Sequence, residues 1–152
     1  MKEIEIRQGR PEDVAAITTL TRQAYSKWIP LIGREPLPML TNYAEAISRH
    51  RFDLLFLGSD FAALIETELR PNDLFVENVA VAPGFQKRGF GRRLMAHAEA
   101  LAVESRRTQI RLHTNSRFRA NVNLYAALGY DVEREEPFRG GLLVHFVKHV
   151  DR

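Results

Sequence analysis

Cysteine is absent from this chain of 152 residues, which excludes disulfide bonds, thiolate metal sites and a cysteinyl reaction intermediate. Long apolar runs are missing too. None approaches the roughly 18 residues that a membrane helix requires, so no membrane partner is expected. Residues 1–7 alternate isoleucine with charge and lack the apolar stretch of a signal peptide. These absences favour a cytoplasmic protein, and the length favours one domain over residues 1–152.

Excess charge of either sign is small, because 22 basic and 19 acidic residues leave a net charge of +3. The basic residues gather at 87–93 and at Arg106 and Arg107. Nucleic-acid binding would need a broader basic face or stacking aromatics, so we expect no nucleic-acid partner and favour a small polyanionic ligand. The histidines lack a compact metal-ligand spacing. His145 and His149 are four residues apart, but on a predicted strand, so no metal site is expected.

Apolar periodicity predicts strands and helices along the whole chain. Strands are expected where apolar and polar residues alternate, and helices where apolar residues recur every three or four positions. A loop with three prolines, residues 28–38, is expected between the first two helices, and such loops are often functional. The expected strands lie around Ile4–Ile6 and at 53–58, 61–69, 74–82, 109–114, 131–139 and 142–150, and the expected helices start at Pro11 and at the cap Thr41 and cover 92–102 and 120–128.

The order of these elements predicts a mixed α/β (α+β) fold. A central, mostly antiparallel twisted sheet of about seven strands would be flanked by about four helices. The strand–helix–strand unit at 74–114 should be parallel and right-handed.

The most informative segment is the glycine-rich turn at 86–91, which follows the breaker Pro83-Gly84 and opens a helix. A strand, a glycine-rich turn and a helix N-terminus form an anion site, because unpaired amides of the first helical turn point at the ligand. Gly89 and Gly91 lack Cβ atoms where a phosphate would approach the backbone. The turn is neither a Walker loop nor a dinucleotide fingerprint, and a solvated basic turn is the alternative interpretation. The cations around it are Lys87, Arg88, Arg92 and Arg93.

Residues 79–94 contain Gln86-x-x-Gly89-x-Gly91, and the helical pattern at 121–130 ends in Leu-Gly-Tyr. These two segments resemble the acetyl-CoA motif and the second motif of the GCN5-related N-acetyltransferase (GNAT) family. The resemblance implies the GNAT-like acyl-CoA N-acyltransferase fold, with acetyl-CoA as cofactor and CoA as product. It also implies direct transfer of the acetyl group to a primary amine within a ternary complex. The residues implied for cofactor binding are Val79, Ala80, Val81, Gln86, Lys87, Arg88, Gly89, Phe90, Gly91, Arg92, Asn121 and Tyr125.

The resemblance also assigns roles within these segments. The strand at 79–81 would splay from its neighbour, and an amide near Val79 would polarise the thioester carbonyl. Tyr125 matches the family tyrosine that protonates the leaving thiolate, a reaction suited to a phenol with a reference pKa near 10. Asn121 lies on the same helix face and would reach the pantetheine amides. Many family members carry asparagine where this chain has Phe118. The alternative to a catalytic Tyr125 is an aromatic side chain that only packs in the core.

Glu77 is the expected general base. It precedes Val79 by two residues, so in a regular strand both side chains would project to the same side, where Glu77 would take the proton of the acceptor amine through water. A β-bulge between the two residues would place their side chains on opposite faces of the strand. The alternatives are a solvated or salt-bridged Glu77, with Glu66 and Glu68 on the preceding strand as rival bases.

The acceptor is expected to bind beside the proline-rich loop, because in the family this region walls the acceptor site. The expected contacts are Trp28, Ile32, Arg34 and Tyr43, an apolar set with one cation that suits a small amphipathic amine with a carboxylate. We therefore expect an acetyl-CoA-dependent N-acetyltransferase acting on a small molecule. The alternatives are acetylation of protein N-termini or lysines and a non-catalytic acyl-CoA-binding module. Whether the chain forms a homodimer stays open.

Overall fold

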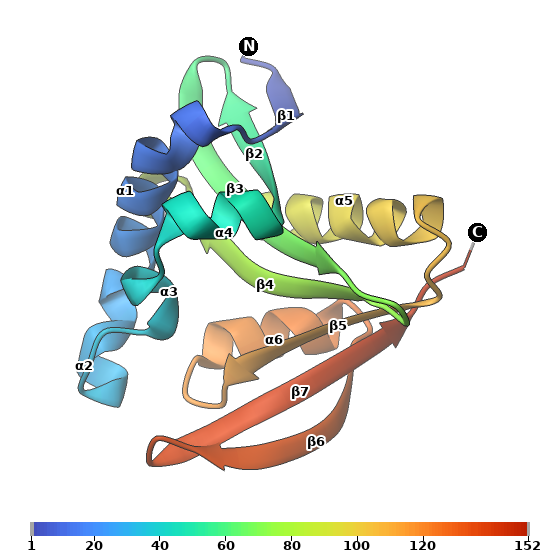
Figure 1. Ribbon diagram of the computed structural model, residues 1–152. Helices are drawn as coiled ribbons and strands as arrows, with labels where there is room; N and C mark the ends of the chain where they lie inside the picture. Colours follow the sequence, from blue (N-terminus) through green and yellow to red (C-terminus); the bar gives the residue numbers. More distant parts are fainter. Residues whose placement is uncertain (1, 152) are drawn as a thin grey trace.

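The computed structural model describes residues 2–151, and its strands form one twisted sheet of seven (Figure 1). The strand order is β1-β2-β3-β4-β5-β7-β6, and every neighbouring pair is antiparallel except β4 and β5. The strands are β1 (Ile4–Gln8), β2 (Arg51–Leu57), β3 (Asp60–Leu69), β4 (Leu74–Val81), β5 (Gln109–Asn115), β6 (Asp131–Phe138) and β7 (Gly141–His149).

Six α-helices connect these strands in the described part of the chain. The helices are α1 (Val14–Tyr25), α2 (Ile29–Ile32), α3 (Leu37–Leu40), α4 (Tyr43–Arg49), α5 (Phe90–Glu104) and α6 (Arg119–Ala127). The longer four match the expected helices, whereas α2 and α3 are single turns in the region expected to be a loop. The predicted mixed α/β fold is confirmed. Within residues 2–151 no helix combines the length and apolarity needed to cross a membrane.

Two apolar clusters hold helices on opposite faces of the sheet. Leu94 and Ala98 of α5, four residues apart, are fully buried in the same cluster as Ile65 of β3. Ile17 of α1 and Leu64 of β3 belong to the other cluster, together with α4. Because successive strand residues point to opposite faces, Leu64 and Ile65 place α1 and α4 on one face and α5 on the other. Burial of each leucine or isoleucine side chain contributes about 1.5–3 kcal/mol to the stability of the fold.

The start of α4 differs from the expectation by one residue. Asn42, not Thr41, is the N-cap, and its Oδ1 accepts hydrogen bonds from the backbone N–H groups of Ala44 and Glu45 at 3.0 and 3.3 Å. The Thr41 hydroxyl instead donates to the Leu37 carbonyl at 3.2 Å, at the end of α3. Asparagine is among the strongest N-cap residues. Because the Thr41 hydroxyl is hydrogen-bonded to α3, Asn42 caps α4 instead.

β4 and β5 are paired only at their start. Leu74–Val76 pair with Ile110–Leu112, and beyond Val76 no register with β5 continues. On its other edge β4 stays paired with β3 as far as Val81. The two halves of the sheet therefore diverge, as the resemblance implies, and the gap opens toward α6 (Figure 1).

A β-bulge interrupts β4 at Glu77. Glu66 pairs with Asn78, and the next residue of β3 pairs with Val76, so Glu77 is the extra residue. The consecutive residues Glu77 and Asn78 consequently line the same cavity, while the side chain of Val79 packs against the cluster under α5. The side chains of Glu77 and Val79 therefore point to opposite faces of the sheet, whereas a regular strand would place them on the same face. Glu77 still faces a cavity.

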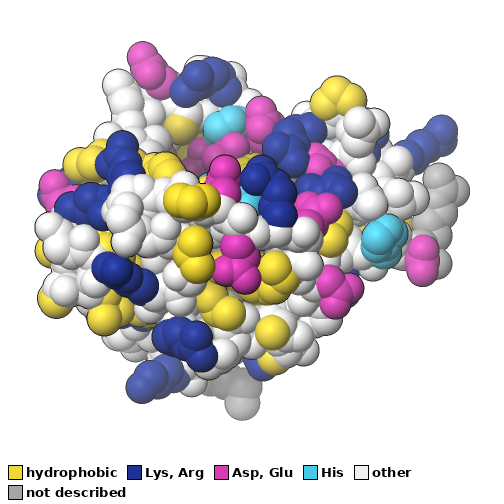
Figure 2. Space-filling view, turned by 90° about the horizontal axis from the view of Figure 1, so that it is seen from below, with side chains coloured by type: hydrophobic (Ala, Val, Ile, Leu, Met, Phe, Trp, Pro, Cys, Tyr) yellow, Lys and Arg dark blue, Asp and Glu magenta, His cyan; other side chains and the backbone are white. Residues whose placement is uncertain are grey.

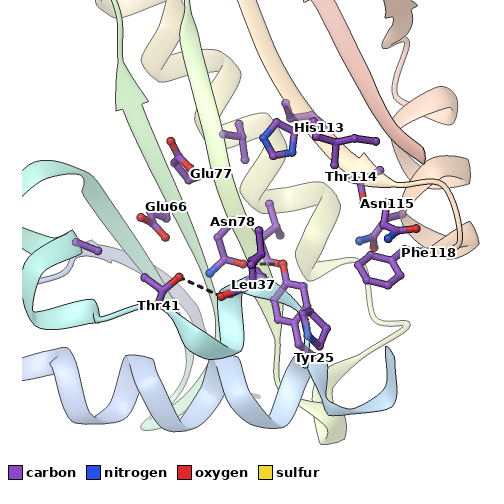
Figure 3. Close-up of a pocket in the computed structure, with 18 of the residues that line it drawn as sticks. Tyr25, Leu37, Thr41, Glu66, Glu77, Asn78, His113, Thr114, Asn115 and Phe118 are labelled. Atoms are coloured by element: carbon purple, nitrogen blue, oxygen red, sulfur yellow. Dashed lines mark hydrogen bonds between the residues drawn. The ribbon is translucent and has the colours of Figure 1, made fainter. Parts of the chain in front are cut away.

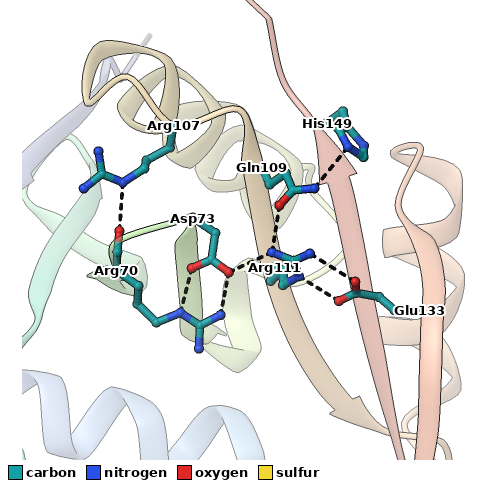
Figure 4. A network of polar contacts seen from close by, with 7 residues as sticks. All are labelled: Arg70, Asp73, Arg107, Gln109, Arg111, Glu133 and His149. Carbon is teal, nitrogen blue, oxygen red and sulfur yellow. Dashed lines mark hydrogen bonds and ion pairs between the residues drawn. The ribbon is translucent and has the colours of Figure 1, made fainter.

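A buried carboxylate anchors the end of the sheet where β4 begins (Figure 4). Asp73 is 4% exposed and accepts two hydrogen bonds from Arg70, both at 2.6 Å, and one from Arg111 of β5 at 3.1 Å. Arg111 also donates to both oxygens of Glu133 of β6, at 2.7 and 3.1 Å. The hydrogen bonds from Arg70 hold the pKa of Asp73 below its usual value. This network keeps β4 and β5 together before they diverge.

We expect Asp73→Asn to lower the free energy of unfolding at pH 7 by about 1.5–3 kcal/mol, because hydrogen bonds to a charged group are lost. A depressed carboxyl pKa means that this stabilisation is present above about pH 4, the unfolded aspartate value, and is lost as the pH falls further. Urea unfolding at pH 7 and at pH 3 measures both effects. Asp131→Asn, at an exposed aspartate, is the control, and an equal loss from both variants would contradict the prediction.

Candidate active site

Two cavities adjoin where β4 and β5 diverge. The inner cavity, of about 370 Å³, includes in its lining Ile32, His50, Glu66, Glu77 and Phe118 (Figure 3). The turn cavity, of about 420 Å³, includes in its lining Lys27, Trp28, Gln86, Gly89 and Arg92. Four residues line both cavities, so the two spaces meet at them. These junction residues are Tyr25, Val79, Asn121 and Tyr125.

The turn before α5 has the geometry of an anion site. Gly89 is the N-cap of α5 with a φ of 83°, a left-handed conformation that favours glycine. Among the described residues no side chain caps this helix, so the amides of its first turn are free for a ligand. Lys87, Gly91 and Arg92 line the same cavity. Amides, cations and the dipole of a 15-residue helix therefore favour negative charge at one place.

Gln86 holds the turn against β4. Its side-chain N–H donates to the Val81 carbonyl at 2.9 Å, and its Oε1 accepts from Lys27 Nζ at 3.0 Å. Burial lowers the pKa of Lys27, and Lys87 adds to that effect. Lys27 thus brings a cation from the 3₁₀ turn that follows α1 to the glycine-rich turn, across a separation of 59 residues that no sequence pattern indicates.

The backbone of β4 is open on the side that faces away from β3. Ala82 N–H donates to the Ala62 carbonyl at 2.9 Å, and in an antiparallel pair such bonds recur at every second residue. The N–H and C=O groups of Val79 and Val81 therefore point away from β3, where β5 no longer pairs. The Val79 carbonyl accepts from the Tyr25 hydroxyl at 3.0 Å, which leaves the Val79 N–H directed into the gap.

Tyr125 reaches the junction of the two cavities from α6. It is 6% exposed, and its ring packs against those of Phe146 and Tyr130 with centroids 5.8 and 6.0 Å apart. Burial raises the pKa of Tyr125 to about 12, and no charge or hydrogen bond from the described residues adds to that shift. The hydroxyl therefore stays protonated near neutral pH and is free to donate.

A buried hydrogen-bonded chain links α1, α4 and the bulge. The Tyr25 hydroxyl lies 2.7 Å from Asn78 Oδ1 as well as 3.0 Å from the Val79 carbonyl, and Asn78 Nδ2 donates to the Tyr43 hydroxyl at 3.4 Å. Asn78 is 5% exposed, so its amide must be satisfied inside the protein. Asn78 is not among the site residues predicted from the sequence, although a lone amide in an apolar strand is a usable signal.

One histidine, His50, lies among the three candidate bases Glu66, Glu68 and Glu77. His50 Nδ1 is 2.7 Å from Glu66 Oε2, while its Nε2 is 3.8 Å from Glu68 Oε2 and 3.9 Å from Glu77 Oε1. Burial raises the pKa of both Glu66 and Glu77, which makes each carboxylate a stronger base. Glu66 and Glu77 line the cavity, whereas Glu68 does not. The structure therefore brings together carboxylates that the sequence presents as rivals.

His50 is also the histidine most relevant to the expectation that no histidine binds a metal. Ligand atoms of His50, Glu68 and Glu77 all lie within 4.8 Å of one another, and these donor types bind divalent cations. The expectation stays a prediction, which metal analysis of the purified protein would test.

The residues predicted for the acceptor are divided between the cavities. Ile32, Arg34 and Tyr43 line the inner cavity, but Trp28 lines the turn cavity. Trp28 stacks on Phe118 with ring centroids 4.6 Å apart, and Phe118 lines the inner cavity. One ring of this stacked pair therefore lines each cavity, and Phe118 stands where many family members have asparagine.

The residues predicted for the cofactor line the turn cavity with the exception of Arg88. The Arg88 guanidinium lies over the rings of Phe85 and Phe90, 5.4 and 5.7 Å from their centroids. A cation held against two rings contributes to the packing of the turn.

Comparison with known proteins agrees with this geometry. A model of the Acetyltransferase (GNAT) family matches residues 18–130, and no curated protein matches the sequence. The ribosomal-protein-S18-alanine N-acetyltransferase of Escherichia coli is 17% identical, with 99% of this chain and 96% of that chain covered and a TM-score of 0.81. PaiA N-acetyltransferase of Thermoplasma acidophilum, in complex with coenzyme A, is 18% identical over 94% and 98% of the chains, with a TM-score of 0.79. Ard1 of Thermoplasma volcanium is 16% identical over 98% and 99%, with a TM-score of 0.77.

The chain belongs to the GNAT acetyltransferase family, as its two motifs imply. It is accordingly an acetyl-CoA-dependent N-acetyltransferase that acts on an amine. The residues of the turn cavity fit CoA, because three cations, Lys27, Lys87 and Arg92, line it together with the uncapped start of α5, which suits a diphosphate.

Proposed function

We propose that the protein transfers the acetyl group of acetyl-CoA directly to a primary amine of a small molecule, within a ternary complex. The meeting of the two cavities at the junction residues supports this proposal. The turn cavity would hold acetyl-CoA, which supplies the activated acetyl group, and the inner cavity would hold the amine. The absence of cysteine favours direct attack over an intermediate on a protein thiol.

The residues at the junction supply a group for each requirement of acyl transfer. The Val79 N–H would stabilise the charge that develops on the thioester oxygen. The Tyr125 hydroxyl would protonate the leaving thiolate, and Glu77 would accept the proton of the amine through water. Asn121, one helical turn before Tyr125, would hold the pantetheine amides, since it also lines both cavities.

A small acceptor is favoured because two arginines connect the segments around the inner cavity. Arg34 Nη1 donates to the Arg139 carbonyl at 3.3 Å, and Arg117 donates to the carbonyls of Leu31 and Gly140, both at 3.4 Å. These contacts tie the α2 region to the β6–β7 turn, whereas a lysine within a protein would need a groove open on both sides. On the face shown in Figure 2, acidic side chains lie among basic ones at the centre and right of the view, whereas the lower left carries mainly basic side chains.

The test of this function is turnover of acetyl-CoA across a library of amines, amino acids and their amides. We expect the best acceptors to be small, partly apolar amines with a carboxylate, because Arg34 is a cation on the lining of the inner cavity. Arg34→Ala should raise the KM of carboxylate acceptors about tenfold, as expected for one charge-assisted hydrogen bond, and spare the matching amides. Arg117→Ala is the control, since Arg117 makes the same kind of bridge without lining the cavity. Better turnover of peptides than of any small amine would contradict the proposal.

The pH dependence of Glu77→Gln tests the general base. The variant keeps the size of the side chain but cannot accept a proton, so kcat/KM should fall about 10²-fold at pH 7. It should recover partly as the pH rises and free amine becomes abundant. Burial raises the pKa of Glu77, so the acid limb of the parent profile should lie above that of an ordinary glutamate. An equal fall at every pH would indicate positioning instead of proton transfer.

A further inference from the structure

His50 is placed to receive a proton from Glu77. It follows the last residue of α4 as its C-cap, and it lines the inner cavity with Glu66 and Glu77. One ring nitrogen contacts Glu66 at 2.7 Å, and the other faces Glu77 at 3.9 Å. Separations of this size shorten when a substrate closes the site, so they are compatible with transfer either directly or through one water.

Glu66 selects which nitrogen of His50 is free. Its carboxylate is 5% exposed and contacts only Nδ1 of the ring at hydrogen-bonding distance, and a carboxylate at that distance favours the tautomer with its hydrogen on Nδ1. Nε2 is then an acceptor that faces Glu77 and Glu68. A buried carboxylate behind an imidazole both orients the ring and stabilises its protonated form, which is the arrangement that general bases use.

We propose that the His50–Glu66 pair is the terminal proton acceptor of the acetylation reaction, with Glu77 as the group that delivers the proton. This proposal rests on the proposed function. The acceptor ammonium loses its proton to a Glu77 oxygen through water, and Glu77 passes that proton to the lone pair of His50 Nε2. The imidazolium that forms is balanced by the Glu66 carboxylate, and its Nε2–H is returned to water next to the exposed Glu68.

The other charged groups around His50 are compatible with this path. Arg49 of α4 lines the same cavity. Burial raises the pKa of Glu66 and Glu77, and the positive charge of Arg49 offsets part of that rise. The Glu68 side chain is 39% exposed, so the proton has an exit to solvent on the β3 side. His113 of β5 is the second histidine of the inner cavity, but its neighbours are the rings of Phe75 and His145, with no carboxylate in those contacts.

Chemical rescue tests the proposal. His50→Ala leaves a space that free imidazole can enter, so added imidazole should restore a large part of a rate that the variant has lost about 10²-fold. His50→Gln should show the same loss without rescue. Glu66→Gln should lower the rate less, and its effect should nearly disappear in the His50→Gln background, because the two residues act as one unit. The matched control is His97→Gln, since His97 also pairs with a carboxylate, Asp53 at 3.5 Å, but lines neither cavity.

A second measurement does not depend on any variant. ¹⁵N NMR of the imidazole nitrogens in the parent protein should show the form protonated at Nδ1. The opposite tautomer would overturn the proposal, as would a folded His50→Gln variant within twofold of the parent rate. A loss that imidazole cannot rescue and that is equal at every pH would also overturn it and leave His50 a structural role. A parent protein that acetylates no amine would overturn the proposed function itself, whereas an active parent with an unaffected His50 variant overturns only this inference.

Discussion

Replacing Tyr125 with phenylalanine is expected to lower kcat by about 10²–10⁴-fold, the usual contribution of a positioned acid. The affinity for CoA should stay nearly unchanged. The substitution removes only the hydroxyl, because the ring contacts with Phe146 and Tyr130 remain. Without a proton donor, the thiolate would leave unprotonated, which raises the barrier of that step. Steady-state kinetics at saturating acceptor, with calorimetric titration of CoA, measures the two quantities separately.

Tyr130→Phe is the matched control for this prediction. Tyr130 belongs to the same apolar cluster, and its hydroxyl donates to Glu99 Oε2 at 3.1 Å, but it lines neither cavity. Its loss should therefore affect stability by about 0.5–1.5 kcal/mol and leave kcat within about twofold. A kcat of Tyr125→Phe as high as that of the control would reduce Tyr125 to a packing residue.

Local patterns made most of the lining of the turn cavity predictable from the sequence. The spacing of Gln86, Gly89 and Gly91 is set by a short turn whose backbone must approach an anion, so its signal lies within six residues. Tyr125 and Asn121 are related by the period of a single helix, which is equally local. The fold was predictable for the same reason, because alternation and helical periodicity are local properties of the chain.

The inner cavity could not be predicted in the same way, since its contacts join distant segments. Tyr25 and Asn78 are 53 residues apart, and no periodicity relates them. The bulge at Glu77 is an extra residue in the register with β3. The alternation of side chains in a regular strand does not reveal such an insertion. The place of Trp28 in the proline-rich loop predicts an acceptor contact, whereas in the structure Trp28 stacks on Phe118 and lines the turn cavity.

His50 illustrates the same limit. Its sequence neighbours give no sign of a role, because its partners come from β3 and β4. Glu66 is 16 residues away along the chain, and Glu77 lies on β4 with its Oε1 3.9 Å from His50 Nε2. A search for metal-like or catalytic spacing along one element cannot detect such a group.

Replacing Gly89 with valine is expected to weaken CoA binding by at least about 100-fold while the protein still folds. Gly89 has a φ of 83°, and no atom lies within 4 Å of the place where a Cβ would stand. The substitution therefore causes no clash inside the protein. Its cost is the left-handed conformation, about 1–3 kcal/mol for a non-glycine residue and highest for a β-branched one. Relief of that strain would shift the turn and misdirect the amides at the start of α5, and the side chain itself would occupy the space of the phosphate.

Two further variants separate the conformational cause from the steric one. Gly89→Asn introduces a side chain that tolerates the left-handed region, so it should keep the turn and block only the ligand space. Gly84→Val is the control, because Gly84 also has open space around a Cβ but no positive φ, and it lies before the turn. Circular dichroism and thermal unfolding check the fold of each variant, and calorimetric titration gives the Kd of CoA. We expect Gly84→Val to bind nearly as the parent does, Gly89→Asn to lose affinity without losing stability, and Gly89→Val to lose both. A folded Gly89→Val protein with unchanged CoA affinity would show that the phosphates bind elsewhere than at the start of α5.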